Sequence, residues 1–177
     1  MKKIRLFHPD EMVENIYALT PQALAGRGIR GVIFDIDNTV APYEVETPTA
    51  QMEEYFSSLR DAGIQLAFVS NNRGDRVTVF NQSLGFFYVC KAGKPSPKGV
   101  RKCIAHFDLP KEQVLAVGDQ VFTDCLAAHR AGIRFVMVPP IQAAESRFFR
   151  FKRFLERPFV RAFKKRAAGK EQKWDRF

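Results

Sequence analysis

Residues 31–40 read GVIFDIDNTV, and this stretch decides the fold. It begins with an apolar run rich in strand-forming residues, which ends at Phe34 and leads directly into Asp35 and Asp37. Burying two carboxylates without partners is costly, so we expect them at the carboxyl edge of a parallel sheet, where open α/β folds bind ligands. The remaining functional residues are therefore expected at the same edge.

Strand and helix patterns alternate after this stretch. Further strands are predicted at 65–69, 86–90, 114–117 and 134–138, with helical patterns at about 48–62, 75–84, 97–107 and 122–131 between them. Such alternation predicts an α/β fold with a doubly wound, mostly parallel, Rossmann-like sheet. Residues 1–30 predict one or two short helices that lead into the first central strand.

Composition limits the class of protein. The chain has 177 residues, enough for one domain and an appendage, and no apolar run approaches the roughly 20 residues that span a bilayer. The first residues lack the apolar segment of a signal peptide, so we expect a cytoplasmic protein. The three cysteines have no metal-type spacing and are expected to be reduced, buried thiols.

The net charge of +9 belongs to the end of the chain. Residues 1–145 carry 16 basic and 16 acidic side chains, whereas residues 146–177 carry 12 and 3. We therefore divide the chain into a domain at 1–145, with a helical lead-in at 1–30, and a basic tail at 146–177. An anionic partner is expected at the tail.

Helical spacing makes this tail amphipathic. On one side fall Phe148, Phe151, Leu155, Phe159, Ala162 and Phe163, and on the other Arg150, Arg153, Arg157, Arg161 and Lys164. Such a helix fits an anionic membrane surface, although the apolar side could equally dock on the domain, and Pro158 is expected to divide it into two helices. Nucleic acid is not an expected partner, because the chain lacks a recognition fold.

Four polar clusters follow a predicted strand or turn. They are DIDNT at 35–39, SNN at 70–72, GKP at 93–95 and GDQVFTD at 118–124. Because parallel strands end on one side of a sheet, these clusters are expected to converge. Any one of them alone would be a weak signal.

This ordered set resembles the motifs of the haloacid dehalogenase-like (HAD) superfamily. That pattern is DxDx[TV], a Ser or Thr at a strand end, a Lys, and GDxxxxD. The framing segments LFHPDEMVENIYALTPQALAGRGIRGVIFDIDNT and CKAGKPSPKG further resemble subfamily IIIA, in the branch of the bacterial YqeG proteins and the mitochondrial phosphatidylglycerophosphatases. The resemblance implies a phosphatase, that is, a phosphoric monoester hydrolase.

The resemblance also implies catalytic roles. Asp35 would attack phosphorus to form an aspartyl-phosphate, and Asp37 would protonate the leaving oxygen and later take a proton from water. Lys94 would supply positive charge toward the phosphate and the nucleophile, and Ser70 and the backbone N–H of Asn71 would donate hydrogen bonds to phosphoryl oxygen. Thr39 would help to close the loop around the nucleophile.

A divalent cation is implied because two carboxylates would otherwise repel a phosphate dianion. The expected cofactor is Mg²⁺, a hard cation that prefers oxygen ligands. Its predicted ligands are the carboxylate of Asp35, the backbone carbonyl of Asp37, and Asp119, with Asp124 acting through water.

Some assignments remain open on the sequence alone. Lys98 competes with Lys94, although the order GKP favours Lys94. Asn72 and Arg73 could be ligands, but we favour their assignment to the cap and first turn of the following helix.

The motif spacing leaves no room for a cap domain. An open site fits a phosphate on a large carrier, and with the branch resemblance this favours phosphatidylglycerophosphate at the cytoplasmic membrane face. The alternatives are a phosphatase of soluble phospho-metabolites or nucleotides, and a non-catalytic module that binds membrane or ribonucleoprotein through its tail.

Overall fold

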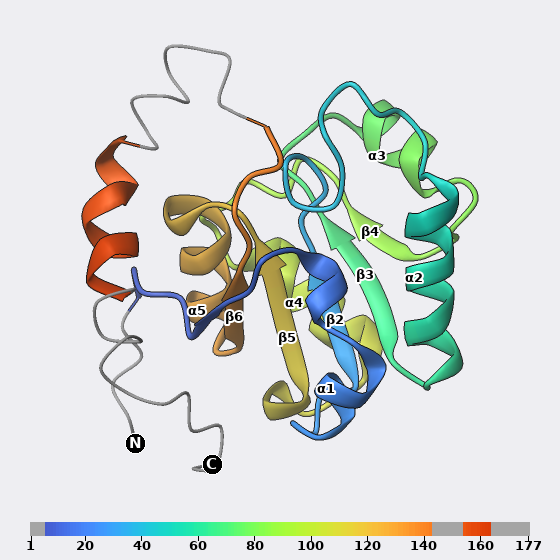
Figure 1. The fold of residues 1–177 in the computed structure, drawn as a ribbon, viewed down its shortest axis with the longest axis horizontal. Coiled ribbons are helices and arrows are strands. Elements are labelled where there is room, and N and C mark those ends of the chain that lie inside the picture. Colours follow the sequence, from blue (N-terminus) through green and yellow to red (C-terminus); the bar gives the residue numbers. More distant parts are fainter. Residues whose placement is uncertain (1–5, 143–153, 164–177) are drawn as a thin grey trace.

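A six-stranded parallel sheet forms the centre of the molecule (Figure 1). The computed structural model describes residues 6–142 and 154–163. The strand order is β1-β6-β5-β2-β3-β4. The strands are β1 (Glu11–Met12), β2 (Gly31–Phe34), β3 (Gln65–Val69), β4 (Phe87–Val89), β5 (Val114–Gly118) and β6 (Arg134–Met137).

Helices cover both faces of the sheet, as a doubly wound fold requires. They are η1 (Ile16–Ala18), α1 (Pro21–Ala25), α2 (Ala50–Asp61), α3 (Gly74–Asn81), α4 (Lys98–Phe107), η2 (Lys111–Gln113), η3 (Val121–Cys125) and α5 (Leu126–Ala131). One apolar core joins the sheet to η1, α1, α2 and α3, and a second joins it to α4, η3 and α5. The predicted α/β class is confirmed.

Strand β2 lies in the middle of the sheet, and all four of its residues are buried. Its last residue, Phe34, is in register with Phe68 of β3 and Val117 of β5. The chain segments that follow β2, β3 and β5 therefore begin side by side. This register brings three of the four polar clusters to one edge.

The chain between the motifs is fully used by elements of the sheet and its covering helices. Residues 40–69 contain α2 and β3, and residues 71–93 contain α3 and β4. Neither interval holds an inserted domain, in agreement with the capless fold predicted. Within the described ranges, none of the helices has the length and apolar character needed to cross a membrane.

Two local features differ from the sequence prediction. Residues 11–12 form the edge strand β1 beside β6, where only short helices were expected; two residues are too few to carry an alternating pattern. The helix predicted at 122–131 begins as the π-helical segment η3, and regular α-helix starts only at Leu126.

Residues 154–163 form one continuous helix that packs on the domain (Figure 1, orange-red). Phe159 packs against Phe7 and Phe122, with ring centroids 5.6 Å away in both cases. The break predicted at Pro158 is wrong, because the helix continues through this residue.

The docked helix keeps part of its predicted apolar side in solvent. Leu155 is 42 % exposed, and Arg157 and Arg161 on the predicted basic side are also exposed. The predicted positions Phe148, Arg150, Phe151, Arg153 and Lys164, and the domain boundary at 145/146, lie outside the described residues.

Candidate active site

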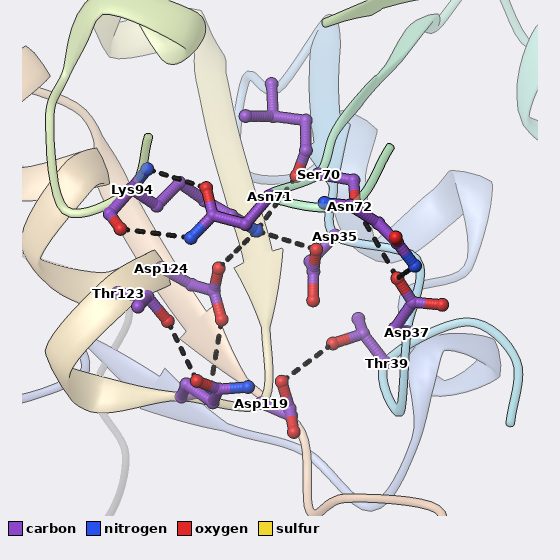
Figure 2. A network of polar contacts seen from close by, with 12 residues as sticks. Asp35, Asp37, Thr39, Ser70, Asn71, Asn72, Lys94, Asp119, Thr123 and Asp124 are labelled. Atoms are coloured by element: carbon purple, nitrogen blue, oxygen red, sulfur yellow. Dashed lines mark hydrogen bonds and ion pairs between the residues drawn. The ribbon is translucent and has the colours of Figure 1, made fainter. Parts of the chain in front are cut away.

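The centre of the site is a buried lysine between two carboxylates (Figure 2). Lys94 Nζ lies 2.6 Å from Asp35 Oδ1 and 2.6 Å from Asp124 Oδ1, and it donates a third bond to the carbonyl oxygen of Val69 at 2.9 Å. All three charged side chains are less than a tenth exposed. The rival Lys98 is exposed at the start of α4, so the geometry selects Lys94.

Burial and charge oppose each other at this centre. Burial raises the pKa of Asp35 well above its usual range, and the carboxylates of Asp124 and Asp119 raise it further, while Lys94 acts to lower it. Burial alone would lower the pKa of Lys94, but Asp124 and Asp35 outweigh that effect and raise it, so the ammonium stays charged. Lys94 contacts two carboxylates of the cluster, and the clustered negative charge that raises the pKa of Asp35 favours an additional cation.

Asp119 completes a group of three buried carboxylates. One oxygen each of Asp35, Asp119 and Asp124 can be chosen so that all lie within 4.8 Å of one another. Thr39 Oγ1 donates a hydrogen bond to Asp119 Oδ1 at 3.4 Å, which joins the loop after β2 to the end of β5. Oxygen donors at this spacing fit a hard divalent cation such as Mg²⁺.

The carboxylate of Asp37 is held apart from this group by three side chains. Asp37 Oδ2 accepts hydrogen bonds from Ser70 Oγ at 3.5 Å and from Asn72 Nδ2 at 3.4 Å. Asp37 Oδ1 forms an ion pair with Nε of Arg76, on helix α3, at 3.4 Å. The two acids of the DxD motif therefore have separate surroundings, one facing a buried lysine and the other a partly exposed arginine.

Asn71 fixes the backbone that carries the lysine. Its Oδ1 accepts the backbone N–H of Lys94 at 2.7 Å, and its Nδ2 donates to the carbonyl oxygen of Lys94 at 3.0 Å. This reciprocal pair joins the end of β3 to the loop before α4. The sequence prediction used only the backbone N–H of Asn71 and missed this role of its side chain.

The loop between Asp35 and Ala41 is a tight turn built on one carbonyl. The backbone N–H groups of Thr39, Val40 and Ala41 all point to the oxygen of Ile36, at 3.2, 2.9 and 3.1 Å. Asn38 adopts a φ of +60°, a left-handed conformation that asparagine tolerates better than most residues. The turn keeps Asp37 and Thr39 at the sheet edge.

The close approach of Asp124 depends on a glycine. A Cβ atom at Gly118 would lie 2.6 Å from the Cβ of Asp124. The backbone N–H of Gln120 also donates to Asp124 Oδ2 at 3.2 Å. Support of the metal by Asp124 through water stays a prediction; the structure adds a direct contact between Asp124 and Lys94.

The sequence prediction gave one residue of the site another role and did not include a second. Asn72 was favoured as a helix cap, but α3 has Arg73 at its N-cap and no side-chain cap bond, while the amide of Asn72 contacts Asp37. Arg76 was not considered at all. It lies within a helix and away from the strand ends, where no motif marks it.

The doubly wound sheet brings strand-end carboxylates, a hydroxyl and a buried lysine together at its carboxyl edge. This arrangement is typical of the α/β phosphatases. The comparisons with known proteins agree. The family model of the haloacid dehalogenase-like hydrolases matches residues 40–132. A Bacillus subtilis protein named "Probable phosphatase YqeG" is 35 % identical over 162 residues, which cover 92 % of this chain and 94 % of that protein.

Two further proteins are more distant. Phosphatidylglycerophosphate phosphatase 1 of the Chlamydomonas reinhardtii chloroplast is 27 % identical, and the match covers 72 % of this chain and 51 % of that protein. The crystal structure of CbbY from Rhodobacter sphaeroides in complex with phosphate has a TM-score of 0.51 at 15 % identity, covering 68 % of this chain and 90 % of that one. The structural likeness shows the fold.

The chain belongs to the haloacid dehalogenase-like hydrolases, as the sequence motifs predicted. It is a phosphatase of this family, a phosphoric monoester hydrolase.

Proposed function

We propose that the protein hydrolyses a phosphomonoester through an aspartyl-phosphate on Asp35, with Mg²⁺ as cofactor and phosphatidylglycerophosphate as substrate. One observation carries the reaction type: Lys94 Nζ lies 2.6 Å from Asp35 Oδ1 inside a buried cluster, while Asp37 lies outside it. Burial raises the pKa of Asp35, and Lys94 opposes this shift by favouring the ionised form, which is the form that can attack phosphorus.

The reaction has two steps. In the first, a carboxylate oxygen of Asp35 bonds to phosphorus, the bond from phosphorus to the alcohol oxygen breaks, and Asp37 gives that oxygen a proton. In the second, Asp37 takes a proton from water, the resulting hydroxide attacks the phosphoryl group, and Asp35 is released. Ser70, Lys94 and the backbone N–H of Asn71 bind the phosphoryl oxygens, and Thr39 orients Asp119.

The residues that would hold Mg²⁺ are Asp35, Asp119 and Asp124, with the backbone carbonyl of Asp37 as a fourth ligand. The fit follows from the donor set, since three buried carboxylates can place one oxygen each within 4.8 Å of one another. When bound, the ion would neutralise charge on the phosphoryl oxygens.

Three features support a lipid substrate. The relative from Chlamydomonas reinhardtii is named a phosphatidylglycerophosphate phosphatase. No domain is inserted over the site in residues 40–93, so a phosphate on a membrane surface could reach it. Basic residues are concentrated in 146–177, and they favour peripheral attachment at the cytoplasmic face of an anionic membrane.

Phosphate release from a substrate panel tests the proposal. We expect the full chain with Mg²⁺ to hydrolyse phosphatidylglycerophosphate in mixed micelles, and Asp35→Asn to lower kcat roughly a thousandfold or more, because an amide cannot form the aspartyl-phosphate. The matched control is Asp61→Asn, an exposed position at the end of α2, which should keep full activity.

Two outcomes would contradict it. A higher kcat/KM for soluble esters such as glycerol 3-phosphate or nucleoside monophosphates would indicate a phosphatase of soluble metabolites. Release from none of these esters would indicate a binding module without activity.

A further inference from the structure

Asn72 connects two exposed basic residues to the proposed acid/base. Its Nδ2 donates to Asp37 Oδ2 at 3.4 Å (Figure 2), and its Oδ1 accepts the backbone N–H of Arg73 at 2.7 Å. The backbone carbonyl of Asn72 accepts the backbone N–H of Lys91 at 3.0 Å. Arg73 and Lys91, which are far apart in the sequence, therefore flank one residue that contacts Asp37.

The charges of Arg73 and Lys91 have no partner in the described part of the chain. Both residues are exposed. Among the described residues, neither side chain makes a hydrogen bond or an ion pair, and Asp75, in the first turn of α3, does not pair with Arg73. By contrast, Arg76 and Lys94 are both held in ion pairs with carboxylates of the site. Two cations beside the site are thus available to a ligand.

The backbone at Lys91 adds a second observation. Its φ is +47°, in the left-handed region that residues with a Cβ adopt only at a cost. The segment is held there by the bond from Lys91 to Asn72 and by a second bond, from the N–H of Ala92 to the carbonyl oxygen of Ser70 at 3.0 Å. Residues in such strained conformations concentrate at ligand sites. A lysine where glycine or asparagine would fit better is therefore a candidate for a binding role.

The position of Asp37 indicates which part of the substrate would reach these charges. Asp37 is proposed to protonate the leaving oxygen, so the alcohol departs on the side where Asn72 contacts it. In phosphatidylglycerophosphate, this alcohol carries a second phosphate one glycerol unit away from the reacting one. Arginine binds phosphate through two parallel hydrogen bonds, and lysine binds it as a point charge.

We infer that Arg73 and Lys91 bind a second phosphate of the substrate, one glycerol unit from the phosphate that reacts at Asp35. The inference rests on the proposed function, because it requires hydrolysis of a phosphomonoester at Asp35. The two residues select by charge, so they favour substrates with two phosphates over simple monoesters. This selection does not need the acyl chains of a lipid.

Three water-soluble esters test the inference. Glycerol 3-phosphate has no second phosphate, glycerol 1,3-bisphosphate has one as a monoester, and glycerophosphoglycerophosphate, the deacylated headgroup of phosphatidylglycerophosphate, has one as a diester. We expect kcat/KM for the headgroup to exceed that for glycerol 3-phosphate by about tenfold, the effect of hydrogen bonds to a charged group at an exposed position. Raising the salt concentration should reduce this ratio.

The double variant Arg73→Gln with Lys91→Gln should lower the ratio to about twofold, which the other charges of the site would leave. Exchange of the two cations, in Arg73→Lys with Lys91→Arg, should keep most of the ratio. The matched control is Arg60→Gln with Lys102→Gln, which makes the same two changes at exposed positions of α2 and α4 and should keep the wild-type ratio. A ratio is used because a loss of folded protein lowers both rates equally.

The outcomes separate the two proposals. Equal kcat/KM for glycerol 3-phosphate and the headgroup overturns the inference and leaves the proposed reaction in place, and so does an equal ratio in the wild type and the glutamine double variant. Hydrolysis of the lipid but of none of the soluble esters also overturns the inference, because a phosphate subsite does not need acyl chains.

Two further outcomes concern the proposed function itself. A higher kcat/KM for the bisphosphate than for the headgroup, after division by its two reacting groups, supports the subsite and contradicts the lipid substrate. Absence of hydrolysis with these esters and with phosphatidylglycerophosphate in mixed micelles overturns the proposed reaction, and the inference with it.

Discussion

Arg76 contacts the acid/base candidate and the loop beside it at the same time. Its Nε pairs with Asp37, while its two terminal nitrogens donate to the carbonyl oxygens of Glu46 and Pro42 at 3.2 and 3.4 Å. The guanidinium lies over the ring of Phe80, 5.2 Å from its centroid. One side chain from α3 thus holds the loop after β2 and orients the carboxylate that we propose to transfer protons.

Replacing Arg76 should therefore affect turnover more than binding. We expect Arg76→Ala to lower kcat by about 10- to 100-fold with little change in KM, since a positioned acid or base contributes 10²–10⁴ in rate. Arg76→Lys should recover part of kcat, because it keeps the charge but cannot make all three contacts. Steady-state kinetics on phosphatidylglycerophosphate measures both.

The control for Arg76 is Arg101→Ala, an exposed arginine on α4 that bonds only a backbone carbonyl in the described contacts. It should leave kcat unchanged. A positioning role is wrong if Arg76→Ala lowers thermal stability while kcat stays at the wild-type value.

Asp119 offers a test of the metal that does not depend on activity. In Mg²⁺-free buffer, Asp119→Asn removes one of three clustered charges, and we expect Tm to rise by roughly 2–4 °C, the shift for about 1 kcal/mol in a chain of this size. Adding Mg²⁺ at 100 times its Kd should stabilise the wild type by about 2.7 kcal/mol and so raise its Tm. The Tm of the variant should barely change. Thermal scans with Mg²⁺ or EDTA report both shifts.

Asp61→Asn again serves as the matched control, and its response to Mg²⁺ should equal that of the wild type. An equal response of Asp119→Asn would mean that the buried carboxylates do not bind the ion.

At the scale of single residues, the strand ends were the predictable part of the site. The positions of Asp35, Asp119 and Lys94 follow from hydrophobic patterns that stop at a polar motif. Arg76 could not be found in this way, since its contact with Asp37 depends on how α3 packs beside the loop. Asn72 belongs to the SNN motif, and the prediction missed only that its side chain points to Asp37.

Among the elements, the helix at 154–163 is attached by a carboxylate as well as by an aromatic ring. Glu156 is 2 % exposed, and its Oε1 accepts the backbone N–H of Phe122, at the start of η3, at 3.0 Å. The first N–H groups of a helical segment lack partners within it, so an acidic side chain there is favourable. The helix therefore caps the segment that carries Asp124.

Loss of this cap should loosen the docked helix. Glu156→Ala leaves the part-buried N–H of Phe122 without this acceptor, at a cost of about 1 kcal/mol. We expect faster amide exchange at Phe122 and through 154–163, and a Tm lower by a few degrees. Glu156→Gln keeps an acceptor oxygen and should behave much more like the wild type; equal exchange in all three proteins would contradict the capping role.

Elements with a strong period were predictable and short or irregular ones were not. Helix α4 places Val100, Cys103, Ile104 and Phe107 on its buried side, as the spacing predicted. The edge strand β1 and the π-helical η3 depend on contacts with β6 and β5 that no local pattern specifies. The tail helix was predicted by its spacing, but the buried Glu156 was not.

At the scale of the whole molecule, the charge is divided between a neutral domain and a basic tail. The docked helix still exposes Arg157 and Arg161, together with Phe154, which is 61 % exposed. The helix can therefore pack on the domain and still present basic side chains to an anionic surface. The sequence had left both arrangements open.

Reversing two of these charges tests the proposed membrane contact. Arg157→Glu with Arg161→Glu should weaken binding to vesicles that contain phosphatidylglycerol by at least tenfold, because each basic residue near the surface contributes about 1 kcal/mol. Vesicle sedimentation at low and high salt measures the effect, which salt should reduce. The control is the double variant Arg60→Glu with Arg101→Glu, which changes the net charge by the same amount on the domain. Equal loss of vesicle binding in both double variants would show that the tail does not form the membrane contact.

The central place of β2 has a consequence for how the molecule divides its tasks. This strand is hydrogen-bonded on both sides, so its amides should be among the last to exchange with solvent, and the proposed nucleophile is attached to its end. Helix α3, which carries Arg76, instead leads to β4 at the margin of the sheet. We therefore expect local opening at this margin to loosen the contact with the proposed acid/base Asp37 while the proposed nucleophile stays in place.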